Sequence, residues 1–157
     1  MISRVIGKKE SRDELLSSFE GLLQKISGAA ESFGRRPRVF FEEWNDPLIS
    51  GIQWVKELVG IAGGETIYPE FRNGRKAKDR IATPEQVIER NPDVIFVSWC
   101  GMKANMDEIA SRSGWDQIAA ARHGHIYEIR STYILQPGPA GLTKGIRQLH
   151  CILAHVS

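Results

Sequence analysis

The chain has 157 residues, of which 41% are hydrophobic and 25% are charged, and its formal net charge is +2. This length predicts one domain with a full core, and the composition is that of an ordinary globular protein. The small net charge argues against nucleic acid or an anionic membrane as a partner. No apolar run approaches the roughly 20 residues that a membrane-spanning helix needs.

A long amphipathic helix is predicted first. Ser11 and Glu14 have capping-box spacing, and apolar residues then recur every three or four positions as far as residue 33. A short buried strand follows at 39–41, and the Asn-Asp-Pro turn at 45–47 leads into a second helix over about 49–59. The segment ETIY is a candidate strand. The basic loop that follows it, including residues 72–80, is expected to be solvated.

The second half of the chain alternates helices and strands. Thr83, Pro84 and Gln86 form a strong start for a short helix. The apolar run DVIFVSW is typical of a parallel strand that is covered on both faces. Two helices near 104–110 and 115–121, the strand HIYEI and a last helix over 142–153 complete the pattern. The order predicts an α/β three-layer sandwich with a mostly parallel sheet of about four to five strands, preceded by the long helix.

Ligands of such sheets bind beyond the carboxyl ends of the strands. The loops predicted at those ends hold Trp44, Trp99 and Tyr133. Each residue alone is readily explained as a partly buried side chain with a packing role only. Together, flat aromatic side chains on one edge suit a large planar or ring-shaped ligand.

Catalytic readings have weaker support. Glu42 and Glu43 are adjacent, and adjacent strand residues point to opposite faces, which argues against a paired-carboxylate hydrolase. At least one of the two is expected to be solvated. Cys100 could act as a nucleophile with His123 or His125 as base, but both histidines are expected in an exposed turn. A small cytosolic α/β hydrolase-type enzyme that uses Cys100 or Glu42 is the alternative from another class.

Two observations bear on the compartment and on metal binding. The start of the chain, MISRVIGKKE, lacks the apolar region of a secretory signal, so the chain is expected in the cytoplasm if Met1 is the natural start. Cys100 and Cys151 form neither a disulfide framework nor a metal-ligand spacing, although the sequence is compatible with one disulfide between them. No metal site is expected.

Five segments, in this order, carry a resemblance to a known family: RPRVFFEEWNDPLISG, WVKELVGIAGGETIYPE, TPEQVIERNPDVIFVSW, GWDQIAAARHGHIYEI and ILQPGPAGL. They resemble the carboxyl-terminal lobe of class III substrate-binding proteins of ABC importers, which carry vitamin B12, iron-siderophores or haem. The likeness is closest to cobalamin-binding members and covers about residues 7–155. Such proteins have two α/β lobes joined by one long helix. The resemblance therefore implies that residues 1–36 are the connector helix, that 37–157 form one lobe, and that the amino-terminal lobe is missing.

The resemblance implies non-catalytic capture of a corrinoid for import, with a ferric siderophore or haem as the alternative ligand and no intrinsic cofactor. The ligand would lie against the loops at 42–48 and 131–136 and near 78–80. The implied contact residues are Glu43, Trp44, Leu48, Trp99, Tyr133 and Gln136.

The same resemblance implies partners and a location. Glu85 matches an acidic residue at a helix start that docks to the ABC permease in the cobalamin branch, although the helix dipole alone also favours a carboxylate there. Full-length family members are periplasmic or otherwise extracytoplasmic. A lone lobe offers half a cleft, so ligand binding by this chain alone is expected to be weak or absent. A homodimer could cover the apolar surface where the other lobe would sit.

Overall fold

The sheet of this protein has five strands, described in a computed structural model that covers residues 9–74 and 76–157. The strand order is β2 (Leu48–Ser50), β1 (Arg38–Asn45), β4 (Val94–Val97) and β5 (Ile126–Glu128), and the short β3 (Glu65–Thr66) also pairs with β1. All neighbours of β1 and β4 are parallel except β2. The predicted mostly parallel α/β sheet is therefore confirmed.

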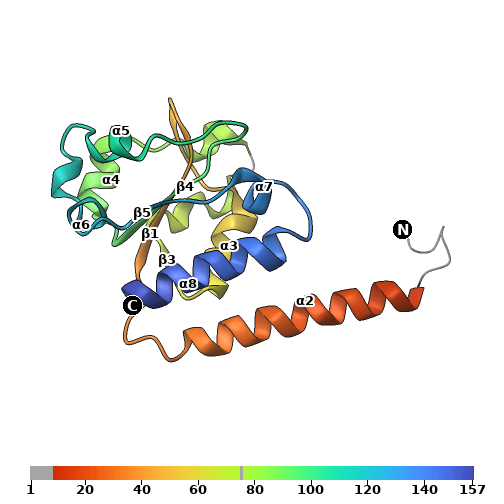
Figure 1. The fold of residues 1–157 in the computed structure, drawn as a ribbon. Coiled ribbons are helices and arrows are strands. Elements are labelled where there is room, and N and C mark those ends of the chain that lie inside the picture. Colours follow the sequence, from red (N-terminus) through yellow and green to blue (C-terminus); the bar gives the residue numbers. More distant parts are fainter. Residues whose placement is uncertain (1–8, 75) are drawn as a thin grey trace.

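Helices cover both faces of the sheet (Figure 1). On one face lie α2 (Lys9–Ala30), α3 (Gln53–Ile61) and α8 (Ile146–Val156), the last preceded by a π-helical turn at Gly141–Gly145. On the other lie α4 (Pro84–Arg90), α5 (Met106–Ala110) and α6 (Ala119–Arg122). The four-residue α7 (Ser131–Ile134) and three 3-10 turns (Pro69–Asn73, Ala77–Arg80 and Trp115–Gln117) complete the described elements.

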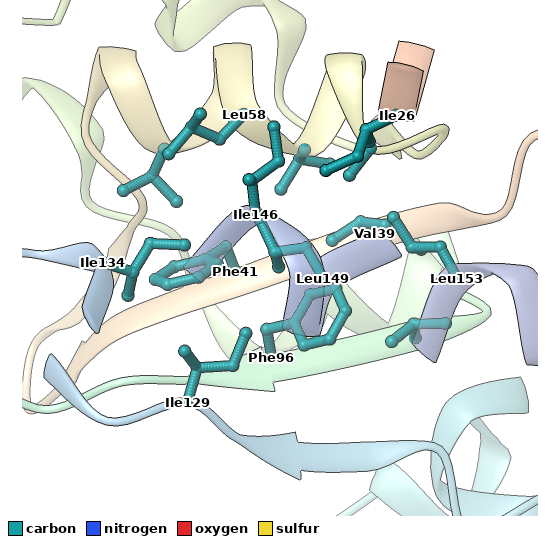
Figure 2. Close-up of a cluster of buried hydrophobic side chains, with 14 residues drawn as sticks. Ile26, Val39, Phe41, Leu58, Phe96, Ile129, Ile134, Ile146, Leu149 and Leu153 are labelled. Atoms are coloured by element: carbon teal, nitrogen blue, oxygen red, sulfur yellow. The ribbon is translucent and has the colours of Figure 1, made fainter. Parts of the chain in front are cut away.

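The alternation of side chains along β1 builds two cores. Val39 and Phe41 point into the core beneath α3 and α8, where Figure 2 shows them beside Leu58, Ile146 and other side chains. Phe40 points into the opposite core, under α4, α5 and α6. All four residues of β4 are buried, as expected for a parallel strand covered on both faces.

The long helix α2 packs on the rest of the molecule through its second half. Ile26 and Ala30 are buried there, whereas Leu15 and Leu16 in the first half are about half exposed. In Figure 1 the amino-terminal end of α2 projects past the helices beside it. The predicted long helix is confirmed, its role as a connector stays a prediction, and residues 1–8 lie outside the described residues. Within the described chain, no helix is long and apolar enough to cross a membrane.

Three local predictions need correction. The segment after the Asn-Asp-Pro turn is first the antiparallel strand β2, so α3 begins at Gln53 and not near Ile49. The loop predicted after β5 contains α7. The basic segment 72–80 is not wholly solvated, because Arg80 is only 2% exposed; Arg75 lies outside the described residues.

Candidate functional site

A hollow of about 500 Å³ lies at the carboxyl ends of β4 and β5. Residues 101–103 of the loop after β4 line one side, and Glu128 with residues 130–132 line the other. Lys103 and Arg130 are exposed and bring positive charge, and Met102 offers a half-exposed apolar side chain. This edge is where parallel α/β sheets bind ligands. The hollow can therefore hold a ligand that combines apolar surface with anionic or polar groups.

Glu42 lies within β1, beside the last residue of β4, Val97, and is fully buried. Its carboxylate accepts two hydrogen bonds from Arg112, at 2.6 and 2.9 Å, and one from the indole N–H of Trp99 at 3.1 Å. The Arg112 guanidinium also lies over the ring of Trp115, 4.6 Å from its centroid. A carboxylate held in this way is a structural ion pair rather than a free catalytic acid or base.

Glu43 points to the other face of β1 and forms a second ion pair. Its carboxylate accepts hydrogen bonds from Arg80 at 2.8 and 3.2 Å and from the Ile52 N–H at 2.9 Å. Arg80 also donates to the Ser50 carbonyl oxygen. The inference that the two glutamates point to opposite faces is confirmed. The expectation that at least one is solvated is wrong, because each carboxylate finds an arginine that lies far along the chain.

The two candidate tryptophans lie close to the strand ends but are engaged with the protein. Trp44 is partly buried, packs against the core beneath α4 to α6, and donates its indole N–H to the Asp46 carbonyl oxygen at 3.1 Å. Trp99 is buried and points its N–H at Glu42. Neither residue lines the hollow at the strand ends. Their roles as ligand contacts stay predictions.

The remaining predicted contacts are dispersed. Leu48 is buried, and Tyr133 is partly buried between Arg130 and Lys144, whose charged groups lie 5.9 and 5.3 Å from its ring centroid. Gln136 lines a different, mainly apolar hollow of about 420 Å³ between α2, α3 and the segment that follows α7. The residues that do line the strand-end hollow, Met102 and Arg130 among them, were not singled out from the sequence. Their position in loops at the ligand-binding edge was the available signal.

The thiol and the histidines of the alternative enzyme lie apart. Cys100 follows the carboxyl end of β4, whereas His123 and His125 precede the amino end of the parallel neighbour β5. The two imidazoles lie near each other, with ring centroids 5.7 Å apart. A Cys100–histidine catalytic pair is therefore not assembled. Cys100 and Cys151 are free and exposed, and no metal-binding cluster of three or more His, Cys, Asp or Glu side chains occurs in the described part of the chain.

Glu85 occupies the first turn of α4, as predicted. Thr83 and Gln86 close the capping box in front of it. Hydrogen bonds from the backbone and from Thr83 hold the pKa of Glu85 below its ordinary value. The side chain is exposed, so this carboxylate is charged at neutral pH and available to a partner.

Comparisons with known proteins agree with this architecture. The chain is 28% identical to an uncharacterized ABC transporter substrate-binding lipoprotein, YvrC of Bacillus subtilis (strain 168), over 95% of this chain and 46% of the relative. It is 29% identical to a vitamin B12-binding protein of Vibrio parahaemolyticus serotype O3:K6 (strain RIMD 2210633), over 67% of this chain and 36% of the relative. The chain thus spans less than half the length of these curated relatives.

A solved structure shares the fold at low sequence identity. S. aureus IsdE complexed with heme superimposes with a TM-score of 0.76 at 18% identity, over 97% of this chain and 60% of that one. The family model described as periplasmic binding protein matches residues 1–133, which is most of the sequence. This chain therefore belongs to the periplasmic binding protein family.

Proposed function

We propose that this chain is a ligand-binding lobe of an ABC-importer substrate-binding protein, and that its ligand is a corrinoid. The hollow at the carboxyl ends of β4 and β5 is the observation that carries the proposal. Its position is the one that this type of sheet uses for ligands. The similarity to a vitamin B12-binding protein supports a corrinoid as the first ligand to test. The function is binding rather than catalysis, in an extracytoplasmic compartment.

The chemistry of the hollow suits such a ligand. Met102 provides apolar contact for a broad ring system, and the exposed cations Lys103 and Arg130 can pair with a phosphate or donate hydrogen bonds to amide oxygens. A lobe that contacts one side of a large ligand buries only part of its surface. We therefore expect binding by this chain alone to be weak.

Haem or a ferric siderophore is the second candidate ligand. The same two cations, Lys103 and Arg130, suit the carboxylates of haem or of an anionic iron complex. A protein of this fold with bound heme, IsdE, supports this candidate. The three ligand classes differ in absorption spectrum, so one set of titrations separates them.

The test is a titration of the purified chain with cyanocobalamin, hemin and the anionic complex ferric enterobactin, followed by ligand absorption and tryptophan fluorescence. Arg130→Ala should weaken binding of the true ligand by about tenfold, because one hydrogen bond to a charged group is lost. Arg122→Ala, which removes an exposed arginine on α6 outside the hollow, is the matched control. Absence of binding to all three compounds at millimolar protein would contradict the ligand proposal.

We propose the permease as a partner through Glu85, an exposed carboxylate at a helix start. Glu85→Lys should abolish transport by the assembled importer and leave ligand affinity unchanged, whereas Glu89→Lys, on the same helix, serves as the control. Unchanged transport by Glu85→Lys would refute this role.

We also propose that a second copy can cover Leu15 and Leu16, which are about half exposed. Light scattering after chromatography should then show a dimer that Leu15→Ser/Leu16→Ser dissociates, and a monomer for the unaltered chain would refute it.

A further inference from the structure

The segment 98–104, which follows β4, is fastened at both ends. At its start, the Ser98 N–H donates to the Glu42 backbone carbonyl at 2.9 Å, and the Trp99 indole N–H donates to the Glu42 carboxylate at 3.1 Å. At its end, the Ala104 N–H donates to the Glu128 carboxylate at 2.9 Å. Between these fixed points, residues 100–103 are exposed, and 101–103 form one wall of the strand-end hollow.

Glu42 is itself held rigidly. It has no exposed surface, and Arg112 grips both of its carboxylate oxygens, at 2.6 and 2.9 Å. Arg112 in turn lies on the fully buried ring of Trp115. Paired hydrogen bonds from one guanidinium fix a carboxylate in direction as well as in position. The Trp99 N–H therefore donates to a carboxylate whose orientation is fixed by Arg112.

Neither member of this arrangement lines the hollow. Glu42 and Trp99 are buried, and the lining comes from residues 101–103 on their loop together with the residues that follow β5. A binding loop that is already ordered loses less conformational entropy when a ligand arrives, which raises affinity. Supporting residues that fix a site without touching its ligand act in this way.

We propose that Glu42 and Trp99 are positioning residues that pre-set the loop 100–103 as a wall of the ligand-binding hollow. The inference rests on the proposed function for the binding role of that wall. It also assigns the buried glutamate a purpose that is neither catalysis nor ligand contact. Glu128 fastens the far end of the same loop and lines the hollow as well.

The loop carries its own reporter, because Cys100 is an exposed free thiol. Cys151→Ser removes the second exposed thiol, and a nitroxide on Cys100 then reports the motion of the loop. Trp99→Phe removes the indole N–H and keeps an aromatic ring, and Glu42→Gln removes the charge at nearly constant shape. Asp93→Asn is the matched control, since it breaks the ion pair with Arg35 at the opposite end of β4.

In Trp99→Phe and Glu42→Gln, we expect a more mobile nitroxide spectrum and amide exchange over 98–104 that is about tenfold faster, the factor for one lost hydrogen bond to a charged group. Far-UV circular dichroism shows whether each variant is folded. If Glu42→Gln does not fold, Trp99→Phe alone provides the test. Asp93→Asn should leave both signals unchanged.

Titration with cyanocobalamin then separates the two proposals. A looser loop with weaker cyanocobalamin binding supports positioning for ligand capture. Unchanged nitroxide spectra in the folded variants overturn the positioning inference, whatever the ligand does. A looser loop with undiminished affinity overturns its link to binding. Failure of the parent protein to bind any tested ligand counts against the proposed function alone, because the loop signals do not require a ligand.

Discussion

The ion pair between Glu43 and Arg80 should respond unequally to the loss of either partner. Arg80 is 2% exposed, whereas the Glu43 side chain is 22% exposed and also accepts a hydrogen bond from the Ile52 N–H. Glu43→Ala leaves a buried positive charge without a carboxylate, and its remaining acceptor is the Ser50 carbonyl oxygen. Arg80→Met leaves a negative charge that still has one donor and some contact with water. The first change should therefore cost more stability than the second.

The magnitudes follow from the depth of the charge that remains. An uncompensated buried charge costs about 3–5 kcal/mol, which is the expectation for Glu43→Ala. Arg80→Met should cost about 1–3 kcal/mol, because the Ser50 carbonyl and a half-satisfied carboxylate lose a donor. The double variant removes both charges and should be more stable than Glu43→Ala. Urea unfolding followed by circular dichroism measures all three free energies.

Arg35→Met is the control for this series, because its ion pair with Asp93 is exposed on the arginine side, at 56%. Its loss should cost at most about 1 kcal/mol. Equal costs for Glu43→Ala and Arg80→Met would refute the reasoning that burial of the remaining charge sets the penalty. A double variant less stable than Glu43→Ala would refute it as well.

Three further predictions concern single residues. Lys56 is 8% exposed and its ammonium finds no hydrogen-bond partner among the described residues; burial, with the charge of Arg80, lowers the pKa of Lys56 from 10.5 to about 8. Between these two pKa values the unfolded chain binds more protons than the folded chain, so the free energy of unfolding should rise with pH across that window. Urea titrations should show that Lys56→Met is more stable than the parent at neutral pH and lacks this rise. Gly63→Ala should lower the melting temperature, because φ is +105° and a Cβ would collide with the Phe33 ring, whereas Gly28→Ala in open space on α2 should stabilise by about 0.5–1 kcal/mol. Thr83→Ala removes the acceptor for the Gln86 N–H and should cost about 1 kcal/mol in chemical unfolding; no loss would show that the cap is dispensable.

The parts of the fold that were predicted correctly are those determined by residues close together in the sequence. The buried strand at 94–97 and the capping box at Thr83 need only a local pattern, and both are confirmed. β2 was not predicted, because Pro47 indicates a turn but does not determine whether a helix or an antiparallel strand follows it. The local pattern could not distinguish them, and pairing with β1 made the segment a strand.

The site was harder to predict because its contacts join distant parts of the chain. Glu42 and Arg112 are 70 residues apart, and Glu43 and Arg80 are 37 apart. No local pattern shows that these carboxylates have partners, so an exposed side chain was the natural expectation. Trp99 was placed correctly at a strand end. Its burial follows from the acceptor that Glu42 supplies, which the sequence does not reveal.

The two adjacent glutamates also bear on how β1 finds its alignment. Residues 39–41 are apolar on both faces of the strand, so a shift of one position would still bury apolar side chains on each side. Such a shift would place Trp44 opposite Arg80 and leave that guanidinium without a carboxylate. Charges with partners in different layers thus forbid a misalignment that the hydrophobic pattern alone would tolerate. In this chain, two ion pairs in the second half of β1 act together with the hydrophobic pattern in favouring one register of this strand.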